Sequence, residues 1–486
     1  MSNNLRDERL KSLEFIRQMG IDPFGGKFPG VTPIKDILAR FPELETHDPN
    51  TGTKITTAGR IMTLRAHGKA AFMDIHDRDA KIQVYIKKDK IGEQLFALYE
   101  HLDLGDIIGV TGVLFKTRTG EITIYADNFT LLTKSLLPMP EKWHGLTDVE
   151  TRYRKRYLDL ISNPEVRASF VQRTKMINSI RQFLQARGFL EVETPMMHPI
   201  PGGATARPFT THHNALNMQL YLRIAPELYL KRLLVGGMER VFEINRNFRN
   251  EGISTKHNPE FTMMELYEAY GDYNTMMELT ESLVVSLVKE ISPDMKLAFG
   301  EKQIDFTAPW QRKPYLELFK EYVGIDWFDK DAILTRARKE GLELKDRSAD
   351  VLANDLFEKF VEPNLQGPVF IIDYPTAICP LTKAKKDKPQ ECERFELFIA
   401  TMEIANAFTE LNDPLDQRAR FQKQLDEKAE GMARMDEDFV TALEHGMPPA
   451  GGLGIGIDRL VMLLTNKQSI RDVILFPLMR EREEGA

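Results

Sequence analysis

The sequence predicts an α+β fold in two parts, a small β-barrel followed by a larger domain on a mixed, mostly antiparallel sheet flanked by helices. Short alternating segments follow one another from residue 53, whereas beyond residue 161 strands and helices mix without regular β-α-β alternation. The chain has 486 residues, 42% of them hydrophobic, which is enough apolar mass for separate cores. We expect a helical extension over 1–50, the barrel over 51–137, a linker over 138–160 and the large domain over 161–486, with a helical insertion at 314–363.

The first segment opens with a predicted amphipathic helix, because Leu10, Leu13 and Ile16 recur at helical spacing. The stretch IDPFGGKFPG that follows is too rich in glycine and proline to continue that helix.

Five strand-like segments come next, with one helical segment at 91–102 between the third and the fourth. A five-stranded barrel of the OB type fits this pattern in about 80 residues. A β-sandwich is the alternative, which the intervening helix disfavours. The five segments are KITTAGRIMTLRA, AAFMDIHD, AKIQVYIKK, DIIGVTGVLFKT and EITIYADNFTLL.

The large domain begins with a well-marked helix. Asn163 stands where an N-cap belongs, Pro164 stands at the first helical position, and Gly188 stands where the helix should end. A strand, FLEVETP, follows and ends at Pro195. The residues that keep the helical period are Val166, Phe170, Ile177, Ile180 and Leu184.

Composition and absent motifs exclude several classes of protein. The two cysteines, Cys379 and Cys392, are too few for a disulfide framework or a four-cysteine zinc site. No G-x-x-x-x-G-K-[ST], H-E-x-x-H or G-x-S-x-G motif occurs, and GGLGIG at 451–456 does not match G-x-G-x-x-G. The apolar stretches are too short to cross a bilayer and the charged N-terminus lacks a signal-peptide core, so we expect a cytoplasmic protein. The net charge of −7 argues against nucleic-acid binding by bulk electrostatics.

Residues 241–270 place polar side chains at odd positions and apolar ones at even positions of two predicted strands. If the hairpin centres near Lys256, odd positions pair with odd, so one face collects the polar set. An exposed antiparallel face is the alternative to a binding face. The odd positions are Glu243, Asn245, Asn247, Arg249, Glu251, Phe261, Glu265 and Tyr267, and Gly252, His257, Asn258 and Pro259 lie in or beside the turn.

The chemistry of this set suits a nucleotide. The planar guanidinium of Arg249 can donate two parallel hydrogen bonds to a phosphate or carboxylate. Glu251 can accept from an exocyclic amine, and Phe261 can stack on a base.

A second hairpin is predicted in RFELFIATMEIANAFTELNDP, turning at residues 400–401. It would make Glu396 and Glu403 diagonal neighbours, close enough to share a divalent ion on polyphosphate oxygens. On a helix the two residues would share a face without any function. Strict parity puts Glu403 out of phase with Asn406, Phe408 and Glu410, so either a bulge intervenes or the two sets serve different sides.

A third motif, GGLGIGIDRLVMLL, runs from a strand of small residues into an apolar helix. Its glycines allow close approach of a backbone or ligand, and Arg459 at the junction adds its charge to the helix dipole. An ordinary surface arginine at a helix start is the alternative.

Together these segments resemble the three motifs of class II aminoacyl-tRNA synthetases: the helix and strand ending at Pro195, FRNE with HNPEF, and GIGIDR. The stretches PGGATARPF, RIAPELYLKRL, FRNEGISTKHNPEFTMMELY and EIANAFTELNDP resemble the lysyl-tRNA synthetases in particular, and the resemblance runs from GIDPF to RDVILFP. The chain departs from the family's usual forms at 400–402, where many relatives have a glycine-rich turn, at Ala407 and in PPAGGLGIG.

The resemblance implies ATP-dependent activation of L-lysine to lysyl-adenylate with release of pyrophosphate, then transfer of lysine to the 3′ end of tRNA(Lys). By match, Arg249 and Arg459 are catalytic, and Glu396 and Glu403 hold Mg²⁺. The residues matched to ATP are Arg249, Glu251, His257, Asn258, Phe261, Glu396, Glu403 and Arg459. Those matched to lysine are Gly203, Glu227, Arg249, Glu265, Tyr267, Asn406, Phe408 and Glu410.

In the barrel, the anticodon contacts of the family match Arg65, Phe72, Gln83 and Glu121. Stacking and base-edge hydrogen bonds do not need a high net charge, which answers the objection from composition. The first motif implies a homodimer. Three rivals remain: a sister enzyme for aspartate or asparagine, a truncated paralogue that attaches lysine to an elongation factor, and a non-catalytic RNA-binding protein on a dead synthetase. The carboxylates of the amino-acid pocket argue against an enzyme for aspartate or asparagine. The N-terminal barrel argues against the truncated paralogue, and the presence of Arg249, Arg459 and both metal carboxylates argues against a non-catalytic protein.

Overall fold

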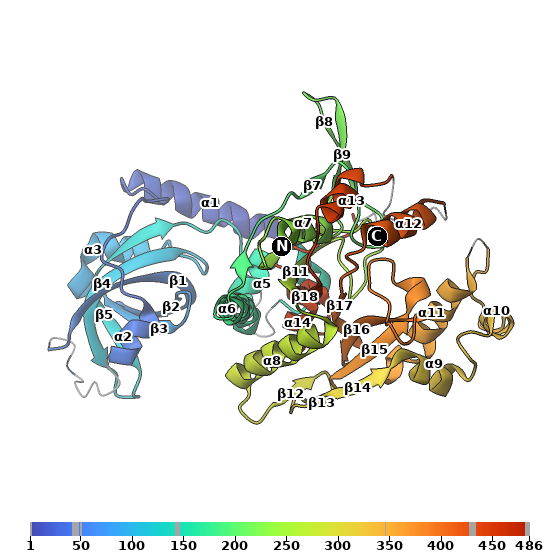
Figure 1. Ribbon diagram of the computed structural model, residues 1–486. Helices are drawn as coiled ribbons and strands as arrows, with labels where there is room; N and C mark the ends of the chain where they lie inside the picture. The colour runs from blue at the N-terminus through green and yellow to red at the C-terminus, as the bar shows by residue number, and fades with distance from the viewer. Residues whose placement is uncertain are drawn as a thin grey trace. The chain divides into compact units, whose positions relative to one another are not determined.

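A computed structural model describes residues 2–40, 48, 51–140, 146–345, 347–426 and 434–481 (Figure 1). The chain divides into two compact units, residues 1–145 and 146–486. The boundary predicted at residue 50 and residues 141–145 of the predicted linker lie outside the described residues. In the described part of the chain, no helix is both long and apolar enough to span a membrane.

The first unit is a closed five-stranded barrel, as predicted, in the order β1-β2-β3-β5-β4. Its strands alternate buried and partly exposed residues, so every second side chain fills the interior. The helix predicted at 91–102 begins at Lys88 and ends at Tyr99. The elements are α1 (Ser2–Gln18), α2 (Ile34–Arg40), β1 (Lys54–His67), β2 (Ala70–His76), β3 (Lys81–Lys87), α3 (Lys88–Tyr99), β4 (Ile107–Lys116) and β5 (Ile122–Thr133).

The second unit is built on an eight-stranded sheet in the order β14-β15-β16-β17-β18-β11-β10-β6. The two outermost pairs, β14 with β15 and β10 with β6, are parallel, and all other pairs are antiparallel. The sheet is therefore mixed and mostly antiparallel, as predicted. Its strands are β6 (Leu190–Glu191), β10 (Arg240–Phe248), β11 (Glu260–Ala269), β14 (Gln311–Pro314), β15 (Val369–Pro375), β16 (Glu391–Ile399), β17 (Met402–Thr409) and β18 (Ala450–Gly456).

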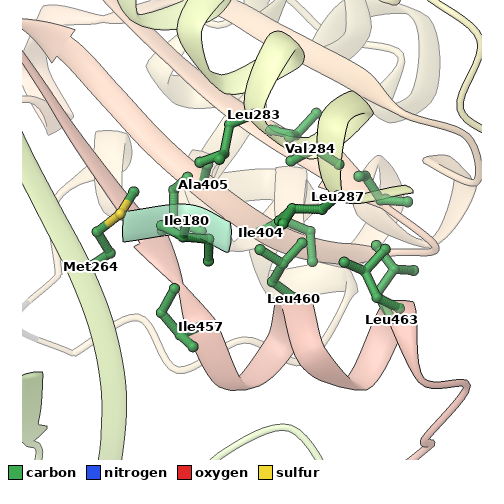
Figure 2. Packing of buried hydrophobic residues seen from close by; sticks show 14 of the residues in the cluster. Ile180, Met264, Leu283, Val284, Leu287, Ile404, Ala405, Ile457, Leu460 and Leu463 are labelled. Atoms are coloured by element: carbon green, nitrogen blue, oxygen red, sulfur yellow. The ribbon is translucent and has the colours of Figure 1, made fainter. Parts of the chain in front are cut away.

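One face of this sheet packs against helices α6 (Pro164–Gln185), α8 (Tyr273–Ile291) and α14 (Ile457–Leu464). Figure 2 shows Ile180, Leu283 and Leu460, one from each helix, meeting side chains of the sheet. Even-numbered residues of β11, such as Met264, enter this core, which leaves the odd-numbered residues for the opposite face.

The other elements surround this frame (Figure 1). Three helices, α9 (Tyr315–Val323), α10 (Lys330–Lys339) and α11 (Ala349–Phe360), lie within the predicted insertion and share a core of their own with β15. The remaining elements are α4 (Val149–Arg154), α5 (Arg156–Ser162), β7 (Met197–His198), β8 (Thr210–His213), β9 (Met218–Leu222), α7 (Glu227–Val235), β12 (Lys296–Phe299), β13 (Lys302–Asp305), α12 (Pro414–Asp426), α13 (Glu437–Glu444) and 3₁₀ turns at Glu362–Asn364, Thr376–Ile378 and Ile470–Asp472.

Candidate active site

The β10–β11 hairpin pairs odd positions with odd positions, as predicted. The pair next to the connecting loop is Phe248 with Glu260, so the hairpin is centred on Ser254 rather than on Lys256. This shift by two residues leaves the parity of the pairing unchanged. Not every odd residue reaches the cavity described below. The carboxylate of Glu243 is buried and accepts a 2.7 Å hydrogen bond from Arg223.

A β-bulge explains how Glu403 can share a face with Glu396 in the second hairpin although their positions differ in parity. Glu396 pairs with Asn406, whereas Phe398 pairs with Glu403, so the register shifts by one residue between Leu397 and Phe398. The shift moves Glu403 onto the same face as Glu396 and Asn406. The alternative in which the two sets serve different sides of the sheet is therefore wrong.

The polar face of the sheet borders one cavity of about 470 Å³. Among the residues matched to ATP and lysine, Glu396 alone does not line it. Every other one does: Gly203, Glu227, Arg249, Glu251, His257, Asn258, Phe261, Glu265, Tyr267, Glu403, Asn406, Phe408, Glu410 and Arg459.

Two glycines leave the cavity its space. Gly203 has a positive φ of 88°, and a Cβ built there would come 3.1 Å from the Cβ of Glu227. A Cβ at Gly452 of β18 would overlap the carboxylate of Glu410 and would lie 2.6 Å from the ring of Tyr267. The close approach predicted at the glycine-rich strand is therefore made by the side chains of Tyr267 in β11 and of Glu410, which directly follows β17.

Arg249 lies in the wall of the cavity with its guanidinium 5.2 Å from the ring centroid of Phe261. Burial lowers the pKa of this guanidinium, and its buried Nε has no hydrogen-bond partner among the described residues. An arginine with a buried, unsatisfied donor in a cavity wall favours an anion there.

Arg459 links the second and third motifs. Its guanidinium donates to the backbone oxygen of Glu403 at 2.9 Å, to the Glu403 carboxylate at 3.1 Å and to Nε2 of His257 at 3.0 Å. Burial, with the adjacent Arg459 charge, lowers the pKa of His257 and favours the neutral ring that accepts this bond. The chain thus brings these three residues together from well-separated sequence positions.

Glu396 lies beside the cavity, held by its neighbours. It accepts hydrogen bonds from Arg394 at 2.5 Å and from Tyr374 at 2.8 Å. Burial raises the pKa of Glu396 to about 7; Arg394 opposes this rise, and the nearby Glu403 adds to it. Two carboxylates on one face are the kind of oxygen donors that Mg²⁺ accepts beside a polyphosphate.

The other end of the cavity is acidic. Glu227, Glu265 and Glu410 all line it, and each is at most 5% exposed. Burial and the neighbouring carboxylates raise the pKa of Glu265 and of Glu410 to about 8. The hydroxyl of Tyr267 donates to Glu265 at 3.2 Å. Such a cluster favours a ligand that carries positive charge.

The sequence-based prediction missed two cations of this site. Lys231 of α7 donates to Glu227 at 2.7 Å and also contacts Glu410. Arg394 donates to Asn406 at 3.1 Å and to Glu396. The signals were present, because Lys231 follows Glu227 by one helical turn and residue 394 shares the strand parity of 396.

The four predicted anticodon residues lie on or beside the outer face of the barrel. Arg65 pairs with Phe72 across β1 and β2, and the oxygen of the Gln83 amide accepts a 2.9 Å bond from Thr123. Glu121, an exposed residue, immediately precedes β5.

Phe72 begins a row of stacked rings on the same face. Its centroid lies 4.7 Å from that of Tyr85, which lies 5.2 Å from that of Tyr125. Both tyrosines were missed, although each occupies an outward position of its predicted strand. A row of aromatic rings is typical of surfaces that stack unpaired bases.

Comparison with known proteins agrees with this geometry. Residues 148–480 match the family described as "tRNA synthetases class II (D, K and N)", and residues 55–132 match the OB-fold nucleic acid binding domain. The chain is 55% identical to the lysine–tRNA ligase of Carboxydothermus hydrogenoformans over 99% of both chains. It is 54% identical to that of Moorella thermoacetica over 99% of both chains, and 54% identical to that of Syntrophomonas wolfei over 100% of this chain and 98% of the other. An OB-fold barrel followed by a class II domain, with relatives of this identity along its full length, places the chain in the lysine–tRNA ligase family.

Proposed function

We propose that this protein activates L-lysine with ATP to form lysyl-adenylate, releases pyrophosphate, and transfers the lysyl group to the 3′ end of tRNA(Lys). The observation that carries the proposal is the polarity of the cavity: three buried carboxylates lie at one end, and the partly buried Arg249, whose Nε has no partner among the described residues, lies in its wall. Lysine has two ammonium groups to meet the carboxylates and one carboxylate to meet Arg249.

In the first step Arg249 holds the α-phosphate of ATP and the lysine carboxylate together. That carboxylate is already ionised at neutral pH, so no general base is needed for its attack on phosphorus. The enzyme contributes alignment of the two reacting groups and neutralisation of the charge that develops on the α-phosphate.

The nucleotide is held by residues of all three motifs. Phe261 stacks on adenine, and Glu251 accepts from its amino group. His257 and Asn258 belong to the loop around the phosphates, and Arg459 holds the γ-phosphate. The bond from Arg459 to His257 supports this placement, because it draws the loop of β10–β11 toward the start of α14.

Glu396 and Glu403 would hold Mg²⁺. When bound there, the ion would neutralise charge on the polyphosphate. The carboxylate pair supplies hard oxygen donors on one face of the β16–β17 hairpin, which is consistent with this role.

For lysine, we assign the ε-ammonium to Glu410 and Tyr267 and the α-ammonium to Glu227 and Glu265. Gly203, Asn406 and Phe408 complete the pocket. Asn406 receives a hydrogen bond from Arg394, and Phe408 offers its ring to the aliphatic stem of the ligand.

For tRNA, we propose that Arg65, Phe72, Gln83 and Glu121 contact the anticodon on the outer face of the barrel. The row of stacked rings there supports this assignment. We further propose that the enzyme works as a homodimer in the cytoplasm, as the resemblance of its first motif suggests.

The test is ATP–pyrophosphate exchange with each of the twenty amino acids in turn. We expect exchange that depends on lysine and is lost in Arg249→Ala. Equal exchange with aspartate or asparagine, or none with lysine, would refute the proposal.

A further inference from the structure

Lys231 is a fully buried cation in the wall behind the acidic end of the cavity. It belongs to α7, is 0% exposed, and donates to Oε1 of Glu227 at 2.7 Å while contacting Oε2 of Glu410. Its Nζ lies 5.6 Å from the ring centroid of Phe408. Among the described residues, the ones that line the cavity include both of these carboxylates but not Lys231. Its ammonium therefore approaches them from the protein side.

This arrangement leaves Glu410 free to bind a ligand on its other oxygen. Both oxygens of Glu410 are buried without a hydrogen-bond partner in the described part of the chain, and Lys231 contacts only Oε2 as an ion pair. Gly452, which lacks a side chain, makes room for Oε1, because a Cβ there would overlap this oxygen. Lys231 thus contacts the carboxylate from the protein side, while Glu410 itself lines the cavity.

The buried ammonium of Lys231 adjusts the net charge of the pocket to that of the two ammonium groups of lysine. When all three carboxylates are ionised in the lysine complex, they and one ammonium leave two net negative charges at this end of the cavity, which balance the two ammonium groups of lysine. A third uncompensated carboxylate would be expensive to keep ionised in a buried site.

We propose that Lys231 is a positioning residue for lysine recognition: its buried ammonium supplies the positive charge that lets Glu227, Glu265 and Glu410 share one pocket and receive both ammonium groups of the substrate. This inference rests on the proposed assignment of these carboxylates to lysine. Lys231 touches no substrate atom in this arrangement and acts through Glu227 and Glu410.

The titration of the pocket supports the inference. Burial by itself would lower the pKa of Lys231, but Glu227 and Glu410 outweigh burial and raise it to about 12. Lys231 in turn opposes the rise in the pKa of Glu410 that burial, Glu227 and Glu265 cause. Without Lys231 that pKa would lie higher still, so a substrate ammonium would have to displace the proton of Glu410 at a greater cost in free energy. The charged and titratable groups around the two acids Glu265 and Glu410 are Arg223, Glu227, Lys231, Arg249 and Tyr267.

The experiment compares Lys231→Met with Lys231→Arg in the full-length enzyme. We expect Lys231→Met to raise the KM for lysine in pyrophosphate exchange by at least about tenfold, with the KM for ATP unchanged, because Glu410 is then harder to ionise when it pairs with an ammonium. The loss should be larger at pH 6.5 than at pH 8.5, since higher pH ionises the carboxylate in the variant as well. Lys231→Arg, which keeps the charge, should restore most of the affinity.

Controls separate this role from a structural one. Lys320→Met, at an exposed position of α9, should leave both KM values unchanged. If Lys231→Met does not fold, Lys231→Gln replaces it and should give the same pH-dependent loss. A KM for lysine that is unaltered, or raised equally at both pH values without rescue by arginine, overturns the inference. Failure of the lysine pocket itself would differ, because Glu410→Gln would then also leave lysine binding intact.

Discussion

At the scale of single residues, oppositely charged side chains of the cavity have buried polar atoms without a hydrogen-bond partner in the described part of the chain. Arg249 has a buried donor without a partner among the described residues, and Glu410 likewise has a buried oxygen without one. Buried polar groups normally find partners inside the protein. Unsatisfied atoms of opposite charge in one cavity therefore indicate where an anionic and a cationic group of the ligand would bind.

Glu410→Gln should cripple lysine binding and spare ATP binding. The amide keeps the shape of the side chain but cannot pair with an ammonium, so we expect lysine affinity to fall by about 100-fold, the scale of a lost buried charged hydrogen bond. Titration calorimetry with lysine and with ATP measures both affinities. Glu301→Gln, at an exposed position, is the matched control. Unchanged lysine affinity would remove Glu410 from the ε-ammonium role.

Lysine binding should release protons at pH 7. Burial and Glu227 raise the pKa of Glu265 to about 8, so this carboxyl is mostly protonated at pH 7 in the ligand-free enzyme. A bound ammonium favours the ionised form, lowers the pKa and drives the proton off. Calorimetry in buffers of different ionisation enthalpy should detect proton release at pH 7, to which Glu265 and Glu410 both contribute, declining as the pH rises above 8. Glu265→Gln should release fewer protons, and no release in the wild type would contradict the assignment.

At the scale of elements, a bulge and a strained turn in the β16–β17 hairpin shape the site. The bulge between Leu397 and Phe398 brings Glu403 into phase with Glu396. The turn that follows places Ala400 and Thr401 at φ values of 52° and 61°, which favour glycine. Their backbone N–H groups donate to Gln366 and Leu365 at 2.9 and 2.8 Å, and these bonds help to offset the strain. The departure from a glycine-rich turn therefore leaves a tight hairpin in place.

Strand β18 provides the element-scale prediction. Gly452→Ala should raise the KM for lysine by more than about tenfold, because the new methyl group displaces the Glu410 carboxylate or the Tyr267 ring by far more than packing tolerates. Gly456→Ala on the same strand is the control, since its Cβ would meet only the Arg459 side chain, at ordinary distances of 3.7 Å or more. Exchange kinetics at varied lysine concentration distinguish the two. Equal behaviour of both variants would contradict the argument.

At the scale of the whole molecule, the two proposed binding sites lie in different units. The cavity is formed entirely by residues of the second unit, whereas the row of stacked rings belongs to the first. In the proposed assignment, lysine and ATP bind in the cavity, and the barrel contributes only to tRNA recognition.

Phe72→Ala should therefore weaken charging of tRNA(Lys) and leave lysine-dependent pyrophosphate exchange unchanged. Loss of one stacking platform is worth about 1–3 kcal/mol, so we expect kcat/KM for tRNA to fall by about 5- to 150-fold. Aminoacylation at varied tRNA concentration measures the effect, with exchange as the internal control. A parallel loss of exchange would show that Phe72 acts on folding rather than on tRNA.

The sequence by itself determined the barrel, the mixed sheet and the polar side of its central hairpin. Strand parity and glycine or proline at element ends are local properties, so Arg249, Glu265 and Tyr267 could be placed before any contact was known. The tertiary structure alone decided the phase of Glu403, the engagement of Glu396 by Arg394, and the buried ammonium of Lys231 between Glu227 and Glu410. A bulge and a buried ion pair both depend on which strands and helices meet, because desolvation and charge pairing act through space between segments far apart in the chain.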